Sequence, residues 1–263
     1  MGCKGVVTDN FMDKTLKAYL PLMNNLENTR NRLDLFLQDL KKIFPEIQSP
    51  ETRINIIKDQ DWGKNWRRFF RPDRVTQRLM VLPAWEPVSD FKKGMVIRID
   101  PGPAFGTGQH PTTRMCLMAM EKINFSDPWT MLDVGTGSGI LSIYASMLGA
   151  SRVVAIDNDP EAIRWAEWNM RLNGLWGKIE LSSHSIETLK DNFSLLAANL
   201  ILGSILNLLP YFERILDHKG WLILSGILWE QVKEVKEKLA EYAFHKDQVL
   251  HDREWACIIA SKR

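Results

Sequence analysis

The residues best suited to chemistry lie in one short stretch that holds three glycines and two acids. An apolar run ends in Gly135, Gly137 and Gly139, each two residues from the next. The chain can turn tightly at glycine, and a ligand can approach the backbone where a Cβ would clash. Asp133 precedes this loop, and Asp157 ends a second apolar run 22 residues after Gly135. A carboxylate at that place can accept hydrogen bonds from the hydroxyls of a ribose.

The pattern around these residues is strand, glycine loop, helix, strand and acid. It predicts the nucleotide-binding half of a doubly wound α/β sheet. A dinucleotide fingerprint needs its third glycine at position 140, where this chain has Ile140. The spacing Asp133-x-Gly135-x-Gly137-x-Gly139 instead resembles the S-adenosylmethionine loop of class I methyltransferases. The alternative is a tight turn between a strand and a helix that binds nothing.

A second loop, rich in glycine and proline, precedes a predicted helix. Its breakers, which exclude a helix or a central strand before His110, are Pro101, Gly102, Pro103, Gly106 and Gly108. Such a loop could fold over a ligand bound at the mouth of the sheet. Thr112 or Thr113 could then cap the following helix and offer a hydroxyl group. The alternative is a rigid surface turn in which His110 is only a cap.

Strand and helix patterns alternate from Met95 to the end of the chain. We expect strands at 130–134, 152–156, 178–182, 195–200 and 220–226, and helices at 112–122, 138–148, 160–172, 204–216 and 229–241. Two more strands, 243–250 and 254–260, are joined by a tight turn and close the chain. Repeated strand–helix units predict a doubly wound, mostly parallel seven-stranded sheet with helices on both faces.

The first third of the chain follows a different pattern. Residues 1–58 predict a small α+β domain, 59–93 a joining segment, and 94–263 the α/β domain. Within the small domain we expect helices at 28–44 and 14–23. The joining segment mixes aromatic side chains with the basic residues Lys64, Arg67, Arg68 and Arg71. Such a mixture can contact RNA weakly, although a linker with docked aromatics and solvated charges explains it better.

The bulk composition excludes several classes of protein. The chain has 263 residues and a net charge of only +2, which gives no general attraction to nucleic acid or acidic membranes. Cys3, Cys116 and Cys257 are scattered, so neither a disulfide framework nor a metal site is predicted, and a cytoplasmic protein is expected. Residues 193–212 contain no charge, but their polar residues and proline favour a buried strand and helix over a membrane span.

Four separated motifs resemble one known family. In order they are AFGTGQHPTT at 104–113, LDVGTGSGILSI at 132–143, VVAIDNDPEAI at 153–163 and AANL at 197–200. This pattern, which covers roughly residues 59–263, resembles the ribosomal-protein L-eleven methyltransferase family. The resemblance implies a class I methyltransferase fold and methylation of lysine and N-terminal amines of a large-subunit ribosomal protein, with S-adenosylmethionine as methyl donor. The small N-terminal domain would then recognise the substrate.

The resemblance also implies which residues form the site. The family's cofactor contacts fall on Thr113, Gly135, Asp157 and Asn199, and its covering loop on Phe105, Gly106 and Thr107. Asn199 is the expected catalytic residue, since it can accept a hydrogen bond from the acceptor amine.

Two departures from the family pattern concern the substrate. Asn199 is followed by Leu200-Ile201-Leu202-Gly203-Ser204, where the family usually reads Ile-Leu-Ala-Gly-Pro, and Leu202 could narrow the acceptor channel. The N-terminal domain is also shorter. Methylation of another protein or of a small amine, and a non-catalytic module that holds the cofactor or RNA, therefore stay open as alternatives.

Overall fold

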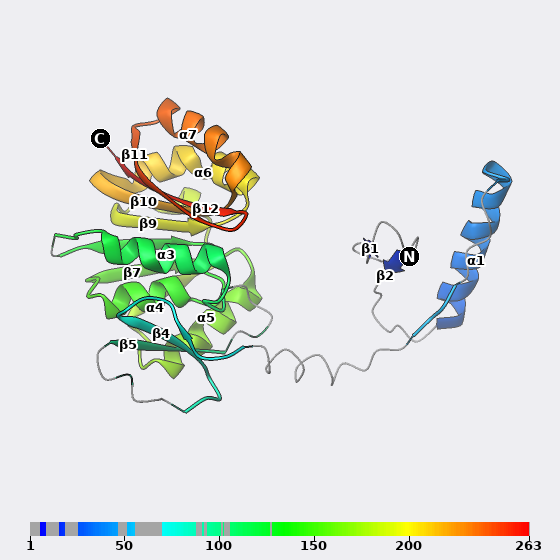
Figure 1. The fold of residues 1–263 in the computed structure, drawn as a ribbon, viewed down its shortest axis with the longest axis horizontal. Coiled ribbons are helices and arrows are strands. Elements are labelled where there is room, and N and C mark those ends of the chain that lie inside the picture. Colours follow the sequence, from blue (N-terminus) through cyan, green and yellow to red (C-terminus); the bar gives the residue numbers. More distant parts are fainter. Residues whose placement is uncertain are drawn as a thin grey trace. The chain divides into compact units, whose positions relative to one another are not determined.

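The computed structural model divides the chain into two compact units, Met1–Lys64 and Asn65–Arg263 (Figure 1). It describes residues 6–8, 16–18, 26–46, 52–55, 70–87, 91, 94–100, 102, 106–126 and 128–262. No helix in these ranges combines the length and the apolar composition needed to cross a membrane.

The N-terminal unit contains a short hairpin and one long helix. Strand β1 (Val6–Thr8) pairs antiparallel with β2 (Leu16–Ala18), and helix α1 spans Leu26–Ile43. The predicted helix at 28–44 is therefore confirmed, with an acid in its first turn and lysines in its last. The predicted helix at 14–23 is wrong at 16–18, where pairing with β1 makes the backbone extended.

The second unit is built on a seven-stranded sheet in the order β11-β12-β10-β9-β6-β7-β8. The strands are β6 (Thr130–Val134), β7 (Arg152–Ile156), β8 (Ile179–Ser182), β9 (Phe193–Asn199), β10 (Leu216–Leu228), β11 (Phe244–Asp252) and β12 (Trp255–Lys262). All pairs from β10 to β8 are parallel, and β12 runs antiparallel to both β10 and β11. The predicted doubly wound, mostly parallel sheet with a closing hairpin is confirmed.

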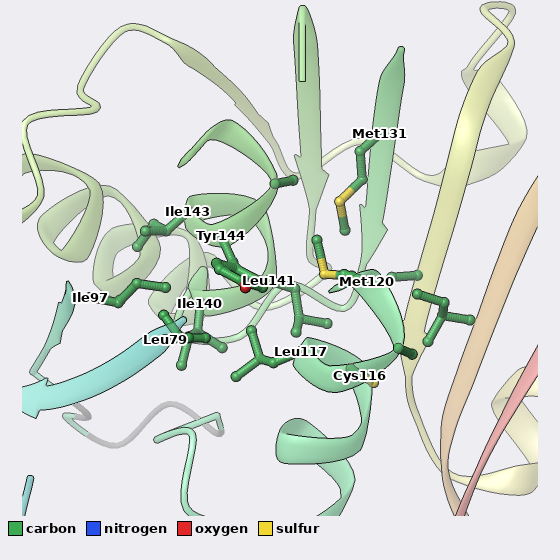
Figure 2. Packing of buried hydrophobic residues seen from close by; sticks show 14 of the residues in the cluster. Leu79, Ile97, Cys116, Leu117, Met120, Met131, Ile140, Leu141, Ile143 and Tyr144 are labelled. Carbon is green, nitrogen blue, oxygen red and sulfur yellow. The ribbon is translucent and has the colours of Figure 1, made fainter. Parts of the chain in front are cut away.

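Helices cover both faces of this sheet because side chains alternate along each strand. On one face, Met131 of β6 packs with α3 (Pro111–Lys122), α4 (Ile140–Met147) and α5 (Pro160–Leu172). Figure 2 shows this cluster, with Leu117 of α3 near Leu141 of α4. On the other face, Leu132 packs with α6 (Leu202–Ile215) and α7 (Val232–Glu241), which follows the 3-10 turn η2 (Trp229–Gln231). A further 3-10 turn, η1 (Ile186–Thr188), precedes β9.

A smaller sheet, in the order β3-β4-β5, belongs to the same unit. Its strands are β3 (Asp73–Arg74), β4 (Leu79–Pro83) and β5 (Met95–Ile99). Strands β3 and β4 lie inside the predicted joining segment, of which 59–69 are outside the described residues. Leu79 and Val81 are fully buried in the same cluster as Met131, so this part of the segment contributes to the core.

Asn169 of α5 and Asn173, the C-cap of that helix, pair with the backbone of β5 and the residue after it as a neighbouring strand would. Asn173 accepts from the Arg98 N–H (2.9 Å) and donates to its carbonyl (2.8 Å). Asn169 does the same with Asp100, at 2.8 and 3.1 Å. Asn169 also donates to the carbonyl of Ser138 (2.9 Å), so one buried side chain links the end of β5 to the glycine loop.

Candidate functional site

The site lies where the order of the parallel strands reverses. The chain passes from β6 outward to β7 and β8, then returns to place β9 on the other side of β6. Sheets of this kind usually bind their ligands at such a switch point, beside the loops that leave the carboxyl ends of the two strands, here β6 and β9. The glycine loop follows β6 and Asn199 ends β9, so the topology brings these two predicted features together.

The glycine loop is a tight turn whose three glycines all have left-handed backbone angles. The φ values of Gly135, Gly137 and Gly139 are 72°, 54° and 82°. The amides of Gly135 and Thr136 both donate to the carbonyl of Ile156, at 2.9 and 3.0 Å. A side chain at any of these glycines would be strained.

At two of these glycines a side chain would also crowd a neighbouring residue of the protein. A Cβ on Gly135 would lie 2.5 Å from Cδ2 of Leu200, and one on Gly139 would lie 3.2 Å from the Cβ of Ala166 in α5. Gly139 therefore allows α5 to approach the loop. Leu200, which the sequence analysis did not single out, is the leucine that lies against the glycine loop.

Asp133, in strand β6, holds the glycine loop in place through side-chain hydrogen bonds. Its side chain is 1% exposed, and its Oδ2 accepts from the hydroxyls of Thr136 and Ser142, both at 2.7 Å. Within the described residues, its Oδ1 is buried and has no hydrogen-bond partner. Burial disfavours the charged form and raises the pKa of Asp133 to about 6, against the lowering effect of the two hydroxyls. Asp133 thus joins strand β6, the loop and α4.

Asp157 lies at the tip of β7, beside the glycine loop. Its Oδ2 accepts from the amide of Gly137 (3.0 Å), and its Oδ1 accepts from the amide of Asp159 (3.0 Å). A carboxylate offers about four lone-pair positions, so both oxygens can accept further hydrogen bonds. The side chain is partly exposed, which leaves it accessible to a ligand.

Of the two polar atoms in the side-chain amide of Asn199, only the nitrogen has a hydrogen-bond partner within the described residues. Its Nδ2 donates to Oγ1 of Thr113 (3.3 Å), a residue 1% exposed in the first turn of α3. Its Oδ1 is buried and without a hydrogen-bond partner in the described part of the chain. An unpartnered buried acceptor is rare and destabilising, so this oxygen is suited to receive a donor from a ligand.

The loop before α3 reaches the glycine loop. Gly106 has φ 106°, its carbonyl accepts from Oγ of Ser138, and a Cβ on it would lie 2.8 Å from that oxygen. Oγ1 of Thr107 accepts from the amide of Gln109 (3.3 Å). Phe105 lies outside the described residues. Gly106 therefore packs on the glycine loop, to which Asp157 also hydrogen-bonds.

His110 is the N-cap of helix α3, the role that one alternative for this loop gave it. Nδ1 of His110 accepts from the amide of Thr112 (3.4 Å), and its ring meets the edge of the Trp255 ring with centroids 5.1 Å apart. Burial lowers the pKa of His110, and the nearby Glu254 partly opposes this effect. Oγ of the buried Ser225 donates to the carbonyl of Thr112 (3.1 Å), which holds the helix start on β10.

The remaining predicted residues make other contacts or lie outside the described ranges. Lys64, Arg67 and Arg68 are outside them, and Arg71 is exposed, with its carbonyl accepting from Gln109. Leu202 is the first residue of α6; it is partly buried and packs against the cluster that α6 and α7 form with the sheet. Ser138, Leu200 and Ser225 were missed because small or apolar residues in loops and strands carry no sequence signal of such contacts.

Comparisons with known proteins agree with this geometry. The family model described as ribosomal protein L11 methyltransferase (PrmA) matches residues 5–263. The chain is 41% identical over 253 residues to the ribosomal protein L11 methyltransferase of Citrifermentans bemidjiense, covering 93% of this chain and 81% of that protein. The corresponding protein of Anoxybacillus flavithermus is 36% identical over 253 residues, with coverage of 94% and 80%.

Solved structures agree as well. The structure is similar to the crystal structure of ribosomal protein L11 methylase from Lactobacillus delbrueckii subsp. bulgaricus, with TM-score 0.69 and 35% identity. The match covers 74% of this chain and all of that one. Precorrin-6y C5,15-methyltransferase from Geobacter metallireducens shares the fold alone, at TM-score 0.50 and 16% identity over 58% of this chain and 89% of that one. The motif resemblance is thus confirmed over nearly the whole sequence, and this chain belongs to the ribosomal protein L11 methyltransferase family.

Proposed function

We propose that this protein transfers methyl groups from S-adenosylmethionine to lysine side-chain and N-terminal amines of ribosomal protein L11. The observation that carries the proposal is the buried, unpartnered Oδ1 of Asn199 at the carboxyl end of β9. This acceptor lies at the switch point, on the strand next to the one that leads into the glycine loop. It is suited to an N–H donor, which an amine substrate carries.

The residues present fit the methyl donor. The left-handed glycines let the loop turn tightly between β6 and α4, and Gly106 packs closely on Ser138 of that loop. Asp157 retains lone pairs for ribose hydroxyls beyond the two backbone amides that it already accepts from. When bound, S-adenosylmethionine supplies an electrophilic methyl group on a positively charged sulfur.

The protein's own contribution is to hold the acceptor nitrogen in place. Thr113 fixes the amide plane of Asn199, so Oδ1 has a defined direction in which to accept an N–H of the amine. Alignment of this kind supplies much of the catalysis in a displacement between two bound partners. The amine must be neutral to react, and its ordinary pKa is about 10.4. A buried setting around Asn199 favours the neutral form.

The substrate assignment is supported by the names of the relatives. The alignment with the relative from Citrifermentans bemidjiense covers 81% of that protein's length. Substrate recognition is assigned to the N-terminal residues 1–58, and the site of action to the cytoplasm. Weak RNA contact through Lys64, Arg67, Arg68 and Arg71 remains a secondary part of the proposal.

The test is incubation of the protein with radiolabelled S-adenosylmethionine and purified large-subunit ribosomal proteins. We expect one labelled band, at ribosomal protein L11, with label on lysine and N-terminal amines by peptide mass spectrometry. Label only on other acceptors would support a methyltransferase with a different substrate. Absence of label on every protein, with calorimetric binding of the cofactor retained, would support a non-catalytic binding module.

A further inference from the structure

An exposed aromatic pair stands at the carboxyl edge of the sheet, outside the residues assigned to the site. The ring of Trp229 is 4.2 Å from that of His251, centroid to centroid, with 36° between the planes. Trp229 is 50% exposed. It directly follows β10, in which Ser225 is the register partner of Asn199 on β9. The pair therefore lies at the same edge of the sheet as the proposed acceptor site.

The hairpin that ends the chain holds this pair in position. The amide of Trp229 donates to the carbonyl of Glu254 (2.8 Å), in the turn between β11 and β12. Leu228 pairs in register with Trp255, whose ring contacts His110 at the start of α3. Because the first turn of α3 also holds Asn199 through Thr113, the aromatic pair and Asn199 are tied to one rigid framework.

The surroundings of the pair are acidic. Glu230 follows Trp229 and is exposed, Glu254 is exposed, and Asp252 is partly exposed. Arg253 is the basic residue in this stretch, so the charges of 251–255 and 229–231 sum to about −2. An exposed indole face beside carboxylates attracts a cation through both its quadrupole and simple charge. Tryptophan is also among the residues that most often dominate binding at interfaces.

We propose that Trp229, His251, Glu230, Asp252 and Glu254 form a docking surface for a lysine-bearing basic segment of the protein substrate. We call this group the Trp229 surface. It holds a cationic side chain next to the amine that is methylated, and so adds affinity and selects basic acceptors. The inference rests on the proposed function, because it concerns the protein acceptor of that reaction.

The test compares three variants of the full-length protein: Trp229→Ala, Trp229→Phe and Trp176→Ala. Trp176 is a matched control, since it is 61% exposed and lies in another part of the surface, against Arg171. KM and kcat are measured with ribosomal protein L11, and the Kd of L11 is measured by calorimetry. Trp229→Ala should raise KM and Kd by about threefold to thirtyfold, the range of a cation on an indole face, with kcat within about twofold.

The other variants separate chemistry from folding. Trp229→Phe should retain most of the affinity because a phenyl ring keeps a π face, and Trp176→Ala should behave as wild type. The double change Glu230→Gln with Glu254→Gln should raise KM and weaken its dependence on salt, since exposed charges are screened. Thermal unfolding checks that each variant is folded.

Several outcomes would overturn the inference. Unchanged KM and Kd for Trp229→Ala, with a wild-type protein that labels L11, would refute the docking surface and leave the proposed function standing. Failure of wild type to label L11 would refute both. A wild-type dimer that dissociates on Trp229→Ala would assign this surface to a second copy of the chain. If Trp229→Ala lowered the hydrogen-exchange protection of residues 26–46 in the absence of substrate, the Trp229 surface would instead be a binding site for the N-terminal unit.

Discussion

The buried carboxyl group of Asp133 should make folding stability depend on pH, and Asp133→Asn should remove that dependence. Burial raises the pKa of Asp133 from 3.8 to about 6. Between these values the folded protein keeps a proton that the unfolded chain has released, so the free energy of unfolding falls as pH rises. The two pKa values differ by about 2, which at 1.36 kcal/mol per pH unit corresponds to about 3 kcal/mol.

The assay is urea unfolding of wild type and Asp133→Asn at pH 4, 5, 6 and 7. Relative to the variant, wild type should lose about 2.5 kcal/mol across this interval, which begins just above the pKa of the unfolded chain, and change little above it. The asparagine oxygen can still accept from Thr136 and Ser142, so the comparison concerns the pH slope and not the absolute stability. Glu234→Gln, which changes an exposed carboxyl group on α7, should follow wild type.

Parallel stability curves for wild type and Asp133→Asn would refute the reasoning. They would mean that the carboxyl group ionises in the folded protein as it does in the unfolded chain. The buried, unpartnered Oδ1 would then have to be hydrated in solution.

The remaining predictions concern the site and the substrate. Asn199→Ala should lower kcat by about tenfold to a hundredfold with cofactor affinity nearly unchanged, whereas the exposed Asn207→Ala on α6 should do neither; equal losses in both quantities would make Asn199 a cofactor ligand only. Asp157→Ala should weaken S-adenosylmethionine binding by about 1.5–3 kcal/mol per hydrogen bond lost, and calorimetry showing full affinity would remove Asp157 from the site. Leu202→Ala should raise the share of trimethylated product by intact-mass spectrometry if Leu202 narrows the channel; because Leu202 begins α6 and packs against the cluster on that face of the sheet, we expect an unchanged distribution and a lower stability. A chain that begins at Asp59 should bind the cofactor normally and lose activity on folded L11, and retained activity would give residues 1–58 another role.

The sequence predicted those parts of the site whose conformation depends on residues close to them in the sequence. Gly135, Gly137 and Gly139 turn the chain between a strand and a helix, and both elements are visible in their own periodicity. Asp157 ends the next strand for the same local reason. Their meeting with Asn199 required the topology, which the alternation of strands and helices also predicted.

The features that could not be predicted depend on contacts between distant segments. Leu200 lies against Gly135, 65 positions earlier, and nothing in either local pattern links them. Strand β4 is short and lies among basic and aromatic residues, so its pattern did not distinguish it from a linker. At 16–18 the apolar spacing suits a helix, and only the pairing with β1 decides for a strand.

Asn169 of α5 and its C-cap residue Asn173 have a consequence for the behaviour of the chain in a crowded solution. Strand β5 is the outer strand of its sheet, and an open outer edge is a template on which other chains can add strands and aggregate. Asn169 and Asn173 make the hydrogen bonds that a neighbouring strand would make. Because these bonds come from side-chain amides and not from a backbone strand, they do not present a new edge that could extend the sheet. Addition of a foreign strand at Arg98 and Asp100 would therefore first require α5 to detach. During synthesis this edge stays open until residue 173 has emerged, and the α5 segment is the part of the nascent chain that closes it.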